Sequence, residues 1–180
     1  PTALGCALLA VGSLGYITAG ILTGESDPGR AGFLHPINAP ASALAALGAT
    51  ILALTLAAWR PASLPRWATQ LAAAGMIFVA AGAWSSATLL VSLAKSFPDD
   101  ESFVAAANTS WAMAWFMVKG VLLVAFLVLA VTGWRSGEIP RAACIVLVPA
   151  ALLSLFPPFP PGGLLAALAF FLISRRPMPA

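Results

Sequence analysis

Long apolar runs recur along this chain, and short polar stretches rich in Gly, Pro and charged residues separate them. The hydrocarbon core of a bilayer is about 30 Å thick, so a helix needs about 20 apolar residues to cross it. None of the runs alternates apolar and polar residues as the strands of a transmembrane barrel do. The pattern therefore predicts an all-α, polytopic transmembrane helical bundle. Its six expected spans cover residues 2–22, 41–59, 67–94, 108–134, 142–156 and 162–174.

The last two runs are shorter than the others, because the proline-rich stretch 157–161 divides them. At 1.5 Å per residue each run reaches roughly 20 Å, which is less than the hydrocarbon thickness. They form either two thin spans or a re-entrant hairpin. Both alternatives return the chain to the side on which it started, so the expected topology is the same.

The composition indicates one integral-membrane domain over residues 1–180. Hydrophobic residues make up 61% of the chain and charged residues only 8%, whereas soluble domains carry about 25% charged residues. The net charge of +3 does not indicate nucleic-acid binding, because the basic residues sit in short loops between spans. The expected partner is therefore the lipid bilayer. Richness in Ala, Gly, Pro and Arg is typical of a GC-rich bacterial genome.

The two sets of span ends differ in charge, and this difference predicts the orientation. One set contains six basic residues and one acid: Arg60, Arg66, Arg135, Arg141, Arg175, Arg176 and Glu138. The other set contains two basic residues and five acids: Arg30, Lys95, Glu25, Asp27, Asp99, Asp100 and Glu101. Basic residues concentrate on the cytoplasmic side of membrane proteins. We therefore expect a multi-pass protein of the inner cell membrane with both termini in the cytoplasm.

Small residues form a stripe along the second expected span. Alanine occupies every fourth position from residue 41 to residue 57, and these positions share one face of a helix. The first span has a similar edge at Gly12, Gly15, Ala19 and Gly20. Small side chains let helix backbones approach closely in lipid. The stripe therefore predicts that the second span is central and packs on more than one neighbour.

Lys119 lies inside the fourth expected span. An ionisable residue at that depth is costly, and by default it is a hypothesis for a functional site. Asn108, Trp111 and Trp115 precede Lys119 at spacings that place all four residues on one helix face. In the predicted topology this face lies between mid-membrane and the outer surface.

Ser85 and Thr88 lie at the same expected depth in span 67–94 and share a face there. Together with Lys119 they predict an outward-facing polar pocket, in which the ammonium pairs with an anionic or amphiphilic small molecule and the two tryptophans form the walls. The alternative is that the Lys119 side chain snorkels to the outer surface or pairs with a loop acid.

The first polar loop contributes a second group of candidates at the outer mouth of this pocket: Glu25, Asp27, His35 and Asn38. Their spacing is not a recognised metal-ligand pattern, so we expect neither a metal nor a cofactor. The alternative for this loop is a solvated connection in which Asp27-Pro-Gly forms a turn.

Three hypotheses for the function follow. The first is a membrane protein that binds or transports an anionic or amphiphilic small molecule. The second is a membrane-embedded subunit of a larger complex, whose small-residue faces pack on partner helices. The third is a membrane enzyme acting on a lipid or isoprenoid. An enzyme is the least favoured, because the chain contains no GxSxG, HExxH or GxxxxGK[ST] motif.

Overall fold

The computed structural model describes residues 1–24, 30–155 and 160–175, with the backbone alone at residues 108–118 and 160. The described chain is all-helical and contains no strand. Its eight helices are α1 (Thr2–Thr23), α2 (Arg30–Leu34), α3 (Asn38–Ala58), α4 (Arg66–Ala87), α5 (Leu89–Ser96), α6 (Asp100–Ser136), α7 (Arg141–Leu153) and α8 (Pro160–Ser174). Four described stretches are long and apolar enough to cross a membrane: Thr2–Thr23, Asn38–Ala58, Arg66–Ser96 and Lys119–Ser136. The fold agrees with the predicted class of a helical membrane bundle.

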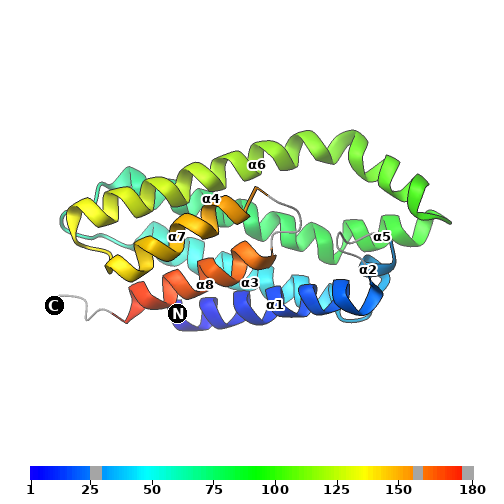
Figure 1. Ribbon diagram of the computed structural model, residues 1–180, viewed down its shortest axis with the longest axis horizontal. Coiled ribbons are helices and arrows are strands. Elements are labelled where there is room, and N and C mark those ends of the chain that lie inside the picture. The colour runs from blue at the N-terminus through cyan, green and yellow to red at the C-terminus, as the bar shows by residue number, and fades with distance from the viewer. Residues whose placement is uncertain (25–29, 156–159, 176–180) are drawn as a thin grey trace.

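Six of the helices form a closed ring around the long axis of the molecule (Figure 1). α1 packs against α3, α3 against α4, α4 against α6, α6 against α7 and α7 against α8, and α8 returns to α1. α3 has the most extensive contacts, and it shares them equally between α1 and α4. The prediction that the second span packs on more than one neighbour is therefore confirmed.

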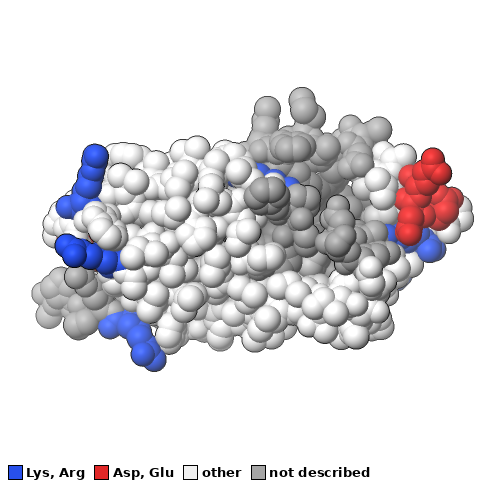
Figure 2. Space-filling model, in the orientation of Figure 1, with Lys and Arg blue, Asp and Glu red and all other residues white. Residues whose placement is uncertain are grey.

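The two ends of the bundle carry different charges (Figure 2). The arginine end, as we call it, holds Arg60, Arg66, Arg135, Arg141 and Arg175. The acidic end holds Asp99, Asp100 and Glu101, together with Arg30 and Lys95. α8 finishes near the arginine end, and α1 begins in the half of the bundle toward that end (Figure 1). Between the ends, large apolar side chains such as Leu54, Ile77 and Ile145 lie exposed on the sides of the bundle, as contact with lipid requires.

α7 and α8 pack side by side as a helical hairpin that extends only part of the way along the bundle (Figure 1). α7 has 13 residues and α8 has 15, so each is about 20 Å long at 1.5 Å per residue. α6, with 37 residues, is about 55 Å long. The hairpin starts and finishes at the arginine end (Figure 1), as both alternatives for the last two apolar runs require.

Two helix boundaries near the acidic end differ from the prediction. The stretch 67–94 was expected to be one helix, but it is divided at Thr88 into α4 and α5. Thr88 leaves the helical backbone conformation (φ −121°, ψ −68°), and its hydroxyl donates to the carbonyl oxygen of Trp84 at 2.9 Å, a bond that bends helices. α6 begins at Asp100 rather than near residue 108, because the Asp99 carboxylate accepts the Ser102 N–H at 2.8 Å and caps the helix.

α1 and α3 touch backbone to backbone near the middle of their lengths. A Cβ atom added to Gly48 would lie 2.7 Å from the carbonyl oxygen of Gly5, and one added to Gly12 would lie 2.5 Å from that of Ala41. Neither position has room for a side chain. In lipid, helices associate through van der Waals contact, so this close approach stabilises the pair. The small-residue edges predicted for the first two spans therefore face each other.

The main core lies within the ring toward the arginine end. Its largest fully buried side chains include Phe126, Phe170, Leu52 and Met76. The rings of Phe126 and Phe170 meet edge to face with centroids 5.9 Å apart, a favoured aromatic geometry. A second, smaller cluster occupies the acidic end and consists of Phe33, Leu90, Ala94 and Phe103.

Candidate functional site around Lys119

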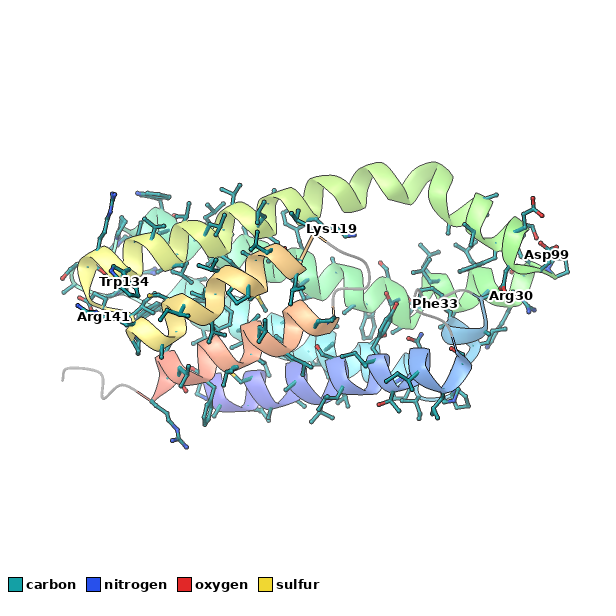
Figure 3. The ribbon with its side chains drawn as sticks, in the orientation of Figure 1. Arg30, Phe33, Asp99, Lys119, Trp134 and Arg141 are labelled. Atoms are coloured by element: carbon teal, nitrogen blue, oxygen red, sulfur yellow. The ribbon has the colours of Figure 1, made fainter. Side chains whose placement is uncertain are left out.

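Lys119 lies near the middle of α6 and at mid-length of the bundle (Figure 3). At 1.5 Å per residue it is about 28 Å from Asp100 and about 26 Å from Ser136 along the helix. Its side chain is half-buried and lies on the bundle side of α6 (Figure 3). The ammonium group is therefore far from both charged ends of the molecule.

The apolar stripe of α6 explains why Lys119 faces the bundle. Leu122, Phe126 and Leu129 follow it at helical spacing and are almost completely buried. Leu122 also packs on α4, where its side chain would lie 3.1 Å from a Cβ atom added to Gly75. Because these residues fix the rotation of α6 about its axis, the lysine one turn before Leu122 shares the inward-facing side.

The predicted partners of Lys119 on α6 are Asn108, Trp111 and Trp115. Their backbone belongs to the continuous helix α6, which agrees with the helical spacing used to group them. Their side chains lie outside the described residues. Their convergence with Lys119 on one ligand stays a prediction.

Ser85 and Thr88 lie where α4 gives way to α5. Ser85 is half-buried and Thr88 is exposed. The hydroxyl of Thr88 is already committed to the carbonyl of Trp84 in its own helix. No hydrogen bond in the described part of the chain joins either residue to Lys119, so their place in a pocket also stays a prediction.

The outer-loop candidates separate in the structure. Glu25 and Asp27 lie outside the described residues. His35 is half-buried, and its Nδ1 accepts the N–H of Ile37 at 3.3 Å. Asn38 begins α3, is 1% exposed, and donates from Nδ2 to the carbonyl oxygen of Ser86 on α4 at 3.5 Å. Asn38 therefore joins two helices inside the bundle, whereas the sequence had grouped it with the loop.

Two buried hydroxyls flank this contact. Ser86 donates to the carbonyl of Gly82 in its own helix at 3.1 Å. Ser42 lies one turn after Asn38, is 2% exposed, and its hydroxyl has no hydrogen-bond partner among the described residues. The interface of α3 with α4 is thus more polar near the acidic end than anywhere in the main core.

Arg30 organises the acidic end, although the sequence analysis used it only as a charge. Its Nε donates to the carbonyl oxygens of Ala94 at 2.8 Å and Phe97 at 2.6 Å, at the carboxyl end of α5. Its backbone N–H donates to the Asp100 carboxylate at 3.1 Å. A cation at a helix C-terminus is favourable because it meets the negative end of the helix dipole. No local spacing connects residue 30 with residues 94–100, so no sequence pattern predicts this contact.

Aromatic rings and a helix cap complete the acidic end. Phe33 contacts Tyr16 and Phe103, with ring centroids 6.4 Å and 5.7 Å away. Backbone and side-chain hydrogen bonds from Ser102 hold the pKa of the Asp99 carboxyl below its ordinary value of 3.8, and the positive charge of Arg30 adds a smaller effect in the same direction. α1, α2, α5 and α6 are therefore joined at this end by a few specific contacts.

The described side chains offer no evident catalytic or metal-binding chemistry. No group of three His, Cys, Asp or Glu residues among them is placed to hold a metal ion. No protein-family model matches the chain, no curated protein is similar to it, and no solved structure matches its fold. The function is therefore inferred from the chain's own residues, among which Lys119 has the most unusual position.

Proposed function

We propose that this protein spans the inner cell membrane and binds or transports an anionic or amphiphilic small molecule, with Lys119 as the counter-charge. The single observation that carries the proposal is the position of Lys119: a basic side chain at mid-length of an apolar bundle, on the inward side of α6. A charge held in an apolar environment is stabilised by a group of opposite charge.

The half-length hairpin supports the same proposal. In the orientation we propose, the arginine end faces the cytoplasm, and α7 and α8 re-enter the membrane from that side. The hairpin extends only part of the way along the bundle (Figure 1), so α7 and α8 contribute to the ring of helices only in the half next to the cytoplasmic side. A ligand that reaches Lys119 then enters from the opposite side, where Asn108, Trp111 and Trp115 are expected to line its path.

Native mass spectrometry of the gently extracted protein tests the ligand. The wild type is compared with Lys119→Met and with the matched control Lys95→Met, which removes the other lysine from its exposed position on α5. We expect a small anionic mass on the wild type and on the control, and at least about tenfold lower occupancy on Lys119→Met, since a lost charge partner costs 2–5 kcal/mol.

The outcomes separate the hypotheses. A chain without ligand in all three samples, or equal occupancy in all three, refutes a binding role for Lys119. Additional protein chains in the spectrum identify the protein as a subunit of a complex instead.

Cysteine labelling tests the proposed orientation. Cys6 and Cys144 are both buried and are first replaced by Ala. Ser63→Cys then places an exposed thiol at the arginine end, and Ser96→Cys places one toward the acidic end. A membrane-impermeant maleimide applied to intact cells should label only Ser96→Cys; labelling of Ser63→Cys alone would reverse the orientation.

A further inference from the structure

A groove of about 240 Å³ runs between α6 and α7 on the outside of the bundle near the arginine end. Val131, Trp134 and Arg135 line it from α6, and Ile145 and Val148 line it from α7. On each helix these residues are three or four positions apart and so share one face. Apart from Arg135 the lining is apolar, and it follows the direction of the helices.

The walls of the groove remain open to the surroundings. Val131 is 50% exposed and Ile145 is 60% exposed, although both belong to helices that elsewhere bury their apolar faces. Between the two walls lie Ala130 and Cys144, which are small and buried. The groove therefore has small residues at its floor and larger apolar ones at its rim.

The mouth of the groove at the arginine end is cationic. Arg135 stands at this mouth, and the Arg141 guanidinium lies 5.4 Å from the centroid of the Trp134 ring; Trp134 and Arg141 mark this end of the bundle in Figure 3. Arg141 also begins α7, whose N-terminus has no side-chain cap, so free N–H groups and the positive end of the helix dipole add to the field.

The acid nearest in sequence forms no ion pair with either arginine in the described part of the chain. Glu138 lies in the turn between α6 and α7, but its carboxylate accepts the backbone N–H of Ser63 at 3.0 Å. Within the described part of the chain, neither Arg135 nor Arg141 forms an ion pair with a carboxylate. Both guanidinium groups are exposed and are available to an anion.

We propose that this groove binds one anionic glycerophospholipid from the leaflet at the arginine end. The phosphate sits between Arg135 and Arg141, because guanidinium groups bind phosphate through paired hydrogen bonds. One acyl chain lies along Val131, Ile145 and Val148. A lipid fits where a peptide does not, because the groove joins a cationic mouth at the interface to an apolar channel directed into the hydrocarbon. The site is independent of Lys119.

Lipid competition tests this site. The wild-type protein is reconstituted in nanodiscs with equal amounts of phosphatidylglycerol and phosphatidylcholine of the same acyl chains, and the last lipid retained is identified by native mass spectrometry. We expect phosphatidylglycerol to be retained about tenfold over phosphatidylcholine. The double variant Arg135→Gln/Arg141→Gln should lower this ratio to near one.

Matched controls separate a site from general charge attraction. Arg60→Gln/Arg175→Gln removes the same charge from the same end, including Arg175, whose guanidinium lies 4.7 Å from the Phe171 ring centroid. This variant should keep the preference for phosphatidylglycerol over phosphatidylcholine. If its preference falls as far as that of Arg135→Gln/Arg141→Gln, the lipid is held only by diffuse charge attraction and not by a site. Val131→Trp should displace the lipid while Val124→Trp, at an equally exposed position, should retain it.

Three results overturn the proposal: equal retention of both lipids by the wild type, lipid retention by Val131→Trp that equals that of Val124→Trp, and displacement of phosphatidylglycerol by 10-fold excess inorganic phosphate. The last result would assign the arginines to a free anion rather than to a lipid. Unchanged helicity by circular dichroism verifies that each variant is folded.

Discussion

The arginine half and the acidic half of the bundle are held together by different kinds of contact. Toward the arginine end, six helices enclose a core of apolar side chains that includes Phe126 and Phe170. Its buried hydroxyls bond within their own helices, as Thr69 does to the Arg66 carbonyl and Ser154 to that of Ala151. At the acidic end, α2, α5 and the first turns of α6 are held by a small aromatic cluster and a few hydrogen bonds.

The difference indicates which half can change shape. In lipid the apolar core gains its stability from dense packing, so it resists any separation of its helices. The acidic end depends on Arg30, Asn38 and the rings around Phe33. Because its contacts are few, the loss of one contact removes a larger fraction of the free energy that stabilises this end. We expect the arginine half to be the rigid base of the protein and the acidic half to be the end that opens.

A pair of aromatic substitutions probes this comparison most strongly. Phe126→Ala should lower the free energy of unfolding by about 3 kcal/mol. This value is at the low end of the range for replacing a buried aromatic residue by alanine, because lipid rather than water surrounds the bundle. Phe103→Ala should lower it by about 1 kcal/mol, the value of aromatic contacts in a small cluster. Unfolding by titration with sodium dodecyl sulfate measures both, and equal losses would show that the two halves unfold as one unit.

The next effect should come from Arg30→Met, which removes two charge-assisted hydrogen bonds to the end of α5. We expect a loss of about 1.5 kcal/mol and faster amide hydrogen exchange confined to α2, α5 and the first turns of α6. Arg60→Met is the matched control, because Arg60 also donates to carbonyl oxygens at a helix end, those of Ala57 and Trp59. Unlike Arg30, Arg60 is exposed and bonds only to residues of its own helix end, so it joins no two helices. A similar loss from both variants would contradict a special role for Arg30.

The smallest effect concerns the pH dependence of the Asp99 cap. Because the folded-state pKa of Asp99 is lowered, its ionised form contributes stability above the unfolded pKa of about 3.9, and this contribution is lost as the pH falls through the lower folded value. The protection of amides 100–107 from exchange, measured relative to their intrinsic exchange rates, should therefore fall below about pH 4. Asp99→Asn should abolish this pH dependence while preserving the helix, since Asn is also a good N-cap.

The apolar runs predicted the all-helical class, and the alanine stripe predicted that α3 packs on more than one neighbour, because spans of bilayer length and small-residue stripes are local properties of a sequence. The break at Thr88 and the early start of α6 depend on single hydrogen bonds, to the Trp84 carbonyl and from the Ser102 N–H. Such bonds leave no periodic signal in the sequence. The spacing of Asp99 and Ser102, three residues apart, is nevertheless recognisable as a helix cap.

The candidate site was predictable only in part. The helical spacing of Lys119 from Leu122 and Phe126 places it on the inward face, which agrees with the structure. Asn38 was assigned to the first polar loop because Gly and Pro residues break helices there, yet it begins α3 and donates to Ser86. Contacts of this kind, like those of Arg30, join residues more than 45 positions apart, and their partners emerge only from the way the helices pack.

The ring of helices closes between α1 and α8, which are the first and the last helices of the described chain. α1 and α3 are able to pair as soon as both have left the ribosome, because their contact is made by glycine and alanine on neighbouring spans. The ring itself stays open throughout synthesis until α8 is added. During translation, one side of α1 is therefore available to lipid or to an insertion factor until α8 closes the ring.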